Sequence, residues 1–357
     1  MNRLTTLIAL CSLSLAATAQ VRWLQLEHNF GAFSEDLGAV DATFEMVNES
    51  DKPVRILDAR ATCGCTKPDV PKGDIAPGDT ARIKVTYLAS GRPGRFSKNI
   101  YVRTSAKPSE QQTLTISGTV IGASATLASR FPVAAGPMKL RSQTVGFGEV
   151  IRGKQKTIFI EGYNQSADTL HPSVDGLPPY IDLNIVPPAV APGEQVQFAF
   201  TLQTLRVPQW GISAEKFTLT PDAGEQPVEM DFFTIVSEDF SQLTPGQRLN
   251  APVATMEPQR INLGEIPAEG VHKVEFELKN SGKSPLIIRR VQAVDSAVVD
   301  VRTSTMKIKP GKSAKIAIEI DPAKAQTDFI NARITVITND PDNSLIAARV
   351  TAEIIRQ

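Results

Sequence analysis

The chain has 357 residues, and 41% of them are hydrophobic, so it can bury substantial cores. Its 38 lysines and arginines balance its 38 aspartates and glutamates, which leaves no formal net charge. A nucleic-acid-binding protein needs a basic face to meet phosphates, so this balance argues against that class of partner. One β-sandwich takes about 100 residues, so the length leaves room for about three.

The first 19 residues resemble a secretory signal peptide. Arg3 supplies a positive start, an apolar run follows from Leu4 to Leu15, and Ala17-Thr18-Ala19 fits a cleavage site. The run is shorter than the ~20 residues that span a bilayer, and no later segment approaches that length. Leu10 precedes Cys11 where a lipoprotein signal has a small residue. We therefore expect cleavage before Gln20, a periplasmic or secreted protein and no transmembrane segment in the mature chain.

A sequence pattern recurs three times along the chain. Each copy has an apolar residue followed by glycine, then an alternating strand that ends at asparagine, and later a Pro-Gly turn before another alternating strand. Alternation with a period of two predicts strands with one buried and one solvated face. The anchors are Phe30-Gly31, Phe147-Gly148 and Leu263-Gly264, then Asn48, Asn164 and Asn280, then Pro77-Gly78, Pro192-Gly193 and Pro310-Gly311.

The spacing of the asparagines is regular. The steps from Asn48 to Asn164 and from Asn164 to Asn280 are both 116 residues (164 − 48 and 280 − 164). We expect each asparagine segment to close a hairpin, because such residues tolerate positive φ. Proline followed by glycine suits the two central positions of a type II turn. Paired strands should close each repeat, such as 98–103 with 114–120 and 332–338 with 347–354.

Frequent turns and short strands at this repeat length predict an all-β protein of three tandem immunoglobulin-like β-sandwich domains after the signal peptide. We place linkers near residues 122–142 and 238–256. The expected limits are 1–19 for the signal peptide and 20–122, 137–240 and 252–357 for the three domains.

The first repeat alone carries two cysteines, in Thr62-Cys63-Gly64-Cys65-Thr66. By alignment of the repeats, position 63 corresponds roughly to residues 174–175 and 295–296, where no cysteine occurs. One interpretation is structural, a local disulfide in a small ring, with Gly64 easing the tight turn. A second is thiol–disulfide exchange, because Arg60 and Lys67 flank the motif and positive charge favours a thiolate.

A third interpretation is a soft-metal site in which Cys63 and Cys65 bind copper or zinc. A closed zinc site needs four ligands, and only His28, His171 and His272 are available to add nitrogen ligands. These histidines form no spaced cluster, and only His28 lies in the same repeat. The sequence therefore supports at most a two-coordinate site or one shared between molecules, and the three interpretations stay open.

The first repeat resembles a family of exported bacterial proteins common in Bacteroidota, the domain of unknown function 1573. The resemblance rests on Cys63-Gly64-Cys65-Thr66, Pro77-Gly78 and the residues from Gly91 to Lys98. The third repeat resembles sperm-protein-like and hydin-like immunoglobulin domains, through Asn280-Ser281-Gly282 and Thr338-Asn339-Asp340-Pro341. The resemblance implies a seven-stranded sandwich and an envelope location, and it implies no established activity.

Two hypotheses for function follow. The first is a non-enzymatic protein of the cell envelope that acts as a binding or structural module, with a protein partner and no cofactor. The alternative is a periplasmic metal-binding or thiol-redox protein that uses Cys63 and Cys65. No signature of a metalloprotease, a serine hydrolase or a phosphate-binding loop occurs in the chain.

Overall fold

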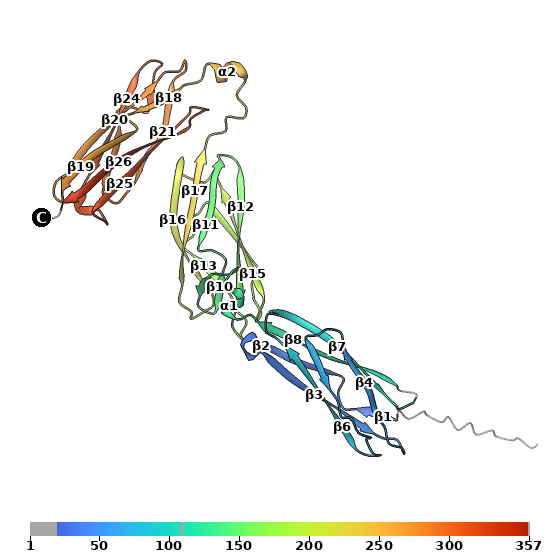
Figure 1. The fold of residues 1–357 in the computed structure, drawn as a ribbon. Helices are drawn as coiled ribbons and strands as arrows, with labels where there is room; N and C mark the ends of the chain where they lie inside the picture. The colour runs from blue at the N-terminus through green and yellow to red at the C-terminus, as the bar shows by residue number, and fades with distance from the viewer. Residues whose placement is uncertain (1–19, 108–109, 356–357) are drawn as a thin grey trace, which may run out of the picture. The chain divides into compact units, whose positions relative to one another are not determined.

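The computed structural model describes residues 20–107 and 110–355, so the predicted signal peptide lies outside the described residues. Within this part of the chain, strands form six sheets, which come in three consecutive pairs along the sequence. Figure 1 shows the three groups of strands by colour, from blue to red. The alternation causes this: Ala42 and Phe44 on β3 are buried while Thr43 between them is exposed. The prediction of an all-β fold is confirmed.

The first group of strands forms a four-stranded sheet in the order β1-β3-β6-β5, which packs against a second in the order β2-β8-β7-β4. Phe44 and Ile83 of one sheet and Ile100 and Leu114 of the other share a core. Burying a side chain of this kind contributes about 2 kcal/mol. The elements are β1 (Val21–Trp23), β2 (Glu27–Ser34), the 3₁₀ turn η1 (Glu35–Leu37), β3 (Ala39–Asn48), β4 (Ile56–Ala61), β5 (Thr66–Asp69), β6 (Thr80–Leu88), β7 (Gly94–Thr104) and β8 (Gln111–Ile121).

The second group repeats this order, with sheets β14-β15-β12-β10-β9 and β11-β17-β16-β13. Phe200 on β15 and Phe217 on β16 meet across the two sheets, with ring centroids 5.5 Å apart. The elements are α1 (Ser124–Leu127), β9 (Val133–Ala135), β10 (Met138–Leu140), β11 (Thr144–Ile151), β12 (Gln155–Asn164), β13 (Ser173–Asp175), β14 (Ile181–Val186), β15 (Gln195–Gln203), β16 (Gly211–Thr220) and β17 (Val228–Ser237).

The third group has sheets β18-β20-β24-β22 and β19-β26-β25-β21-β23, again in the same order. Phe276 and Ile316 of the first sheet and Ile334 and Val350 of the second lie in one core. The elements are α2 (Pro245–Leu249), β18 (Ala254–Glu257), β19 (Arg260–Pro267), β20 (His272–Asn280), β21 (Leu286–Val294), β22 (Val298–Thr303), β23 (Lys307–Ile308), β24 (Ser313–Ile320), the 3₁₀ turn η2 (Pro322–Lys324), β25 (Phe329–Thr338) and β26 (Leu345–Ile355).

By compactness, the chain divides into two units. The first unit takes the residues up to Lys139 together with 163–170 and 189–195, and the second takes the rest. The predicted limits of the three domains therefore stay predictions. The predicted linkers need correction, because β9 and β10 fall within 122–142 and β18 begins within 238–256, and all three strands belong to sheets.

The repeated asparagines do not close hairpins, so that prediction was wrong. Asn48, Asn164 and Asn280 are fully buried, and among the described residues only glycines have positive φ. Each side-chain amide donates to two main-chain carbonyl oxygens, one four residues on and one more than 25 residues away. A buried amide that satisfies distant carbonyls ties two segments together, which sequence spacing alone does not reveal.

The Pro-Gly segments are type II turns, as predicted. Gly78, Gly193 and Gly311 have φ of 82°, 70° and 70°, and the residue after each glycine donates its N–H to the carbonyl three residues earlier. Each turn glycine also donates its N–H to the carbonyl of the repeated asparagine. The predicted closing strands are confirmed too, because β7 pairs antiparallel with β8 and β25 with β26.

The apolar-glycine pairs mark bulges in parallel strand pairs. The strand that carries the pair runs parallel to the last strand of its group, β2 to β8, β11 to β17 and β19 to β26, and the register shifts at the glycine. Gly31, Gly148 and Gly264 have φ between 64° and 67°, a conformation that strains other residues. No helix in the described part of the chain is long and apolar enough to cross a membrane.

Candidate functional site at Cys63 and Cys65

The two cysteines lie in the loop that joins β4 to β5, at one end of the first group of strands. The loop begins where the Thr62 N–H donates to the carbonyl of Asn99 on β7, at 3.1 Å. It ends in a turn in which the Thr66 N–H donates to the carbonyl of Cys63, at 3.2 Å. The Leu88 N–H on β6 then donates to the carbonyl of Cys65, at 2.8 Å. Strands on both sides therefore fix the loop.

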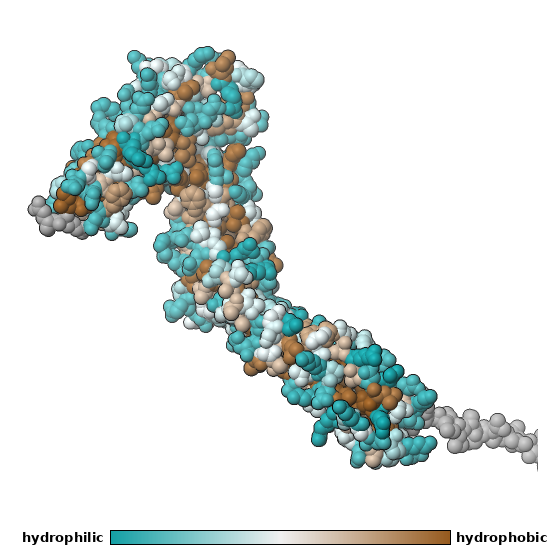
Figure 2. All heavy atoms as spheres, in the orientation of Figure 1, coloured by the Kyte–Doolittle hydropathy of each residue, from teal (hydrophilic) through white to brown (hydrophobic). Residues whose placement is uncertain are grey.

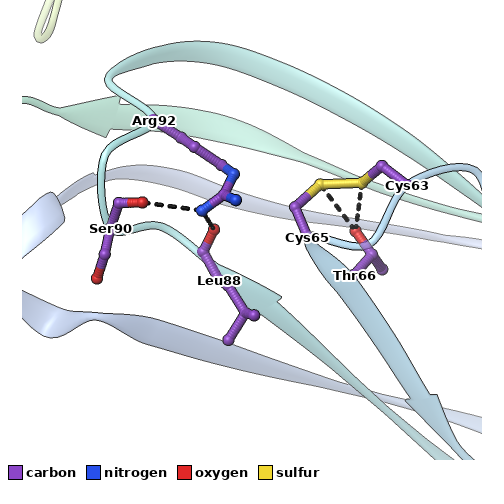
Figure 3. Close-up of a disulfide and its surroundings, with 6 residues drawn as sticks. All are labelled: Cys63, Cys65, Thr66, Leu88, Ser90 and Arg92. Atoms are coloured by element: carbon purple, nitrogen blue, oxygen red, sulfur yellow. Dashed lines mark hydrogen bonds between the residues drawn. A yellow bond between two sulfur atoms is a disulfide. The ribbon is translucent and has the colours of Figure 1, made fainter.

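The sulfurs of Cys63 and Cys65 form a disulfide, with their Cα atoms 5.3 Å apart (Figure 3). The structure thus shows the local disulfide that was one of the three interpretations. Cys65 is 8% exposed and belongs to the core, while Cys63 is half-buried against the same core. The two sulfurs therefore differ in surroundings, because Cys63 lies on the solvent side.

The Thr66 hydroxyl is the polar neighbour of both sulfurs. Its Oγ1 lies 3.6 Å from Cys63 Sγ and 3.8 Å from Cys65 Sγ, and the residue is only 4% exposed (Figure 3). A hydroxyl can donate to a thiolate as readily as it can accept from a thiol. Thr66 is therefore placed to stabilise whichever sulfur carries negative charge after the disulfide opens.

Arg60 and Lys67 were predicted to supply positive charge near the cysteines, and the structure shows other surroundings for them. Arg60 forms an ion pair with Asp58, in which Nε and Oδ2 are 2.6 Å apart, and the Arg60 side chain is 80% exposed. Lys67 is exposed at the start of β5. Arg92 was not predicted as part of this site: its guanidinium donates to the carbonyl oxygens of Ser90, at 2.8 Å, and Leu88, at 3.5 Å (Figure 3).

The Arg92 turn also contacts a buried carboxylate that no sequence pattern singles out. Glu35 is 5% exposed and accepts from the Gly91 N–H, from the Ala123 N–H at 2.7 Å and from the Thr126 hydroxyl at 3.0 Å. These partners lie 56 to 91 residues away in sequence, so no local pattern points to them. Glu35 thus joins the turn beside the disulfide to the segment after β8.

The other two groups of strands form the same turn without cysteines. The Ile181 N–H donates to the carbonyl of Pro178, at 2.9 Å, and the Val298 N–H to that of Asp295, at 3.2 Å. The hydrogen bond from the Leu88 N–H to the Cys65 carbonyl also recurs. Its counterparts run from the Gln203 N–H to the Tyr180 carbonyl and from the Asp321 N–H to the Ala297 carbonyl, both at 2.8 Å. Cys63 and Cys65 therefore correspond to Pro178 and Tyr180 and to Asp295 and Ala297, which corrects the alignment with residues 174–175 in the second repeat.

Gly64 does not have the role that was expected for it. Its φ is not positive, and a Cβ built there would meet nothing within 4 Å. The corresponding residues are Pro179 and Ser296, which confirms that the turn accepts side chains. The turn is therefore a property of the repeated frame, and the disulfide is added to it.

The metal interpretation is not supported by a ligand cluster. The structure places no group of three or more His, Cys, Asp or Glu side chains in a position to hold a metal ion, within the described residues. His28 packs edge-on against Phe30, His171 lies 3.6 Å from Asp222, and His272 is on β20. Copper or zinc binding by Cys63 and Cys65 stays a prediction, and it would require the reduced thiols.

A second feature of the first group of strands is a shallow cavity on the outward face of its β2-β8-β7-β4 sheet. Tyr101 on β7 is 42% exposed, Arg60 is its register partner on β4, and Arg103 lies two residues farther along β7. Hydrophilic and hydrophobic residues are interspersed on the surface of this group in the view of Figure 2. The cavity has a volume of 320 Å³ and is lined by Asp58, Arg60, Tyr101, Arg103 and Gln111.

Among the solved structures to which the chain is similar are one bacterial protein and one human domain. A protein of unknown function from Porphyromonas gingivalis W83 is 21% identical over 61% of this chain and 100% of its own, with a TM-score of 0.49. The ASH/PapD-like domain 7 of human CEP192 is 13% identical over 34% of this chain and 99% of its own, with a TM-score of 0.25. No curated protein matches the sequence.

The family comparisons match the first and third groups of strands. Residues 21–120 match the family described as protein of unknown function DUF1573, which covers all of β1 to β7 and nearly all of β8. Residues 252–353 match the HYDIN/CFA65/VesB-like immunoglobulin-like domain, which covers β18 to most of β26. The part of the chain that holds the disulfide is thus similar to the DUF1573 family, and the third group of strands is similar to the HYDIN/CFA65/VesB-like immunoglobulin-like domain.

Proposed function

We propose that this chain is an exported protein of the cell envelope that acts by binding a protein partner, not by catalysis. The immunoglobulin-like and DUF1573 domains are consistent with a binding or structural module. The repeated frame supports this proposal, because three sandwiches of one topology present separate surfaces on a shared scaffold. Export depends on the predicted signal peptide and is part of the proposal.

The observation that carries the proposal is the cavity beside Tyr101. Tyrosine and arginine are the residues that most often dominate the binding energy of protein interfaces. Here an exposed tyrosine has an arginine beside it on β4 and another two residues along β7, and Gln111 on β8 adds a polar group to the lining. Two guanidinium groups against one carboxylate, Asp58, favour a partner that brings an acidic side chain.

The edge of the same sheet extends the surface. β4 is the outermost strand in the order β2-β8-β7-β4, and it supplies Asp58 and Arg60 to the cavity. An edge strand leaves main-chain N–H and C=O groups available for pairing with a strand from another protein. A partner strand along β4 would lie beside the Tyr101 cavity.

The test is capture of the partner from native envelopes with the tagged full chain, followed by cross-linking and mass spectrometry. Tyr101→Ala and Arg103→Glu should each reduce recovery of the partner by about tenfold or more, as expected for central interface residues. Phe159→Ala is the matched control, because Phe159 is 54% exposed on β12 in the second group of strands. Equal recovery by wild type and Tyr101→Ala would contradict this assignment of the surface.

A further inference from the structure

The disulfide lies in a turn that the other two groups of strands form without cysteines. The turn that ends at Thr66 recurs at Ile181 and Val298 with the same hydrogen bonds and without cysteine. In the third group the Asp295 carboxylate accepts from the Ala297 N–H, at 2.9 Å, which holds the turn by other means. The two cysteines therefore add something that the fold already does without.

The disulfide is also asymmetric toward solvent. Cys65 packs in the core with an exposed fraction of 8%, while Cys63 is half-buried. Thiol–disulfide exchange proceeds by attack of a thiolate on one sulfur, and access decides which sulfur is attacked. An incoming thiolate can thus reach Cys63 Sγ, and Cys65 Sγ is the leaving group.

Burial disfavours charge on the Cys65 sulfur, and the Thr66 hydroxyl is the neighbour that offsets this effect. The Thr66 hydroxyl lies 3.8 Å from Cys65 Sγ and can turn its proton toward it. A hydroxyl donor favours the thiolate form of a cysteine. Thr66 is therefore a positioning residue in this scheme.

We propose that Cys63 and Cys65 form an exchange disulfide that oxidises a pair of cysteine thiols in an exported protein. A substrate thiolate attacks Cys63 Sγ, the Cys63–Cys65 bond breaks, and its electron pair leaves on Cys65 Sγ. The second substrate thiolate then attacks the substrate sulfur of the mixed disulfide and releases Cys63 as a thiolate. The substrate loses two electrons and two protons, and the chain gains both as two thiols.

This inference goes beyond the proposed binding function, because it adds one stoichiometric redox step to a surface that recognises a protein. The two can fail separately. Variants at Tyr101 and Arg103 test the binding surface and leave the disulfide intact, while variants at the cysteines test the exchange and leave that surface intact.

The first experiment traps the intermediate on the full mature chain with glutathione disulfide as the probe. Cys65→Ser should form a mixed disulfide with glutathione at Cys63, seen as added mass on the intact protein. Cys63→Ser should react at Cys65 at least about tenfold more slowly, because that sulfur is buried. Equal rates for the two variants would overturn the assigned asymmetry.

The second experiment measures transfer to a reduced synthetic peptide with two cysteines. The wild-type chain should oxidise the peptide to its disulfide and be reduced to the dithiol itself, in a ratio of one to one. The reaction should be about tenfold faster than with glutathione disulfide at the same concentration. The double variant Cys63→Ser/Cys65→Ser is the blank. A wild-type rate no greater than that of glutathione disulfide would refute the proposal.

Thr66→Val tests the positioning role through a property that folding alone does not control. In the Cys63→Ser background, the pKa of the Cys65 thiol is followed by the ultraviolet absorbance of the thiolate as pH rises. Loss of the hydroxyl should raise that pKa and slow transfer in the wild-type background. An unchanged pKa, with circular dichroism showing a folded chain, would remove Thr66 from the scheme.

Discussion

The side-chain amide of Asn164 donates to the main-chain carbonyl of Val190, at 2.8 Å, although 26 residues separate them. The same bond joins Asn48 to Ile75 and Asn280 to Ile308, at 2.9 and 3.0 Å. Each asparagine also receives the N–H of the glycine in the following Pro-Gly turn. One buried residue per repeat therefore fixes the turn that leads into the next strand.

Replacement of this asparagine should be costly. Asn164→Ala removes the bonds donated to the carbonyls of Asp168 and Val190 and the acceptor of the Ser166 N–H, so the free energy of unfolding should fall by about 2–4 kcal/mol. Guanidinium unfolding followed by circular dichroism measures the loss. Asn184→Ala is the control, because Asn184 is exposed on β14, and it should change stability by less than about 0.5 kcal/mol. Similar effects for both variants would contradict the role of the buried amide.

Glu35 should hold the segment after β8 to the Arg92 turn. In wild type, three donors meet the Glu35 carboxylate. Glu35→Gln gives them an amide group instead, so we expect the free energy of unfolding to fall by about 2–3 kcal/mol. Hydrogen exchange read by mass spectrometry should become faster at residues 89–93 and 122–127. Glu27→Gln makes the same change at an exposed position on β2 and should leave exchange there as in wild type. Unchanged protection in Glu35→Gln would show that the carboxylate does not hold this segment.

Tyr163 should make the protein less stable at alkaline pH. Burial raises the pKa of its phenol, whose oxygen accepts from the Gly122 N–H at 2.8 Å. The stabilisation is fully present below the ordinary phenol pKa of about 10, and it is lost as pH rises from there through the higher folded-state pKa. Tyr163→Phe should therefore flatten the fall in stability above about pH 10.

Tyr163→Phe should also lower the free energy of unfolding by about 1–3 kcal/mol at neutral pH, because the Gly122 N–H loses its acceptor. Burial also raises the pKa of Tyr87 and Tyr180, so part of the alkaline loss should remain. Tyr101→Phe is the control for removal of an exposed phenol. Unfolding midpoints from neutral to alkaline pH measure both effects. An alkaline loss in Tyr163→Phe as steep as in wild type would contradict the assignment.

Processing at the N-terminus tests the export proposal. The mature protein from bacterial envelopes should begin at Gln20, because Ala17-Thr18-Ala19 fits the cleavage site of a signal peptidase. Its mass should lack residues 1–19, and after reduction it should react with two equivalents of a thiol reagent, at Cys63 and Cys65. Ala17→Leu/Ala19→Leu should block cleavage. A full-length chain recovered from the cytoplasm would contradict export.

Much of the fold could be predicted because it depends on local patterns. Strands such as β3, β15 and β24 alternate over eight to ten residues, and the Pro-Gly turns need only two residues. The parallel pairing of β2 with β8 could not be predicted, since it joins residues some 88 positions apart, such as Glu27 and Thr115. The strands β1 and β10, of three residues each, are too short to show a period.

The candidate site was predicted only in part. Cys63 and Cys65 stood out because the other repeats lack them, but spacing could not decide between a disulfide, a metal site and an exchange site. Arg92 and Glu35 were missed because their roles depend on a turn that the fold brings to the cysteine loop. The regular spacing identified Asn48, Asn164 and Asn280 as repeated positions. Their role was predicted wrongly, because asparagine usually favours turns and the sequence does not show buried hydrogen bonds.

An exchange role for Cys63 and Cys65 requires that the first group of strands stays folded when the disulfide is reduced. Closing a ring of three residues is worth only about 1.5 kcal/mol through the entropy of the unfolded chain, and the corresponding turns at Ile181 and Val298 have no disulfide.

Denaturant unfolding of the mature chain with and without a phosphine reductant measures this directly, with hydrogen exchange at β4, β5 and β6 as the local reading. We predict that reduction lowers stability by no more than about 2 kcal/mol and leaves these strands protected. Unfolding of the first group of strands on reduction would instead make the disulfide a structural brace and contradict its assignment as an exchange site.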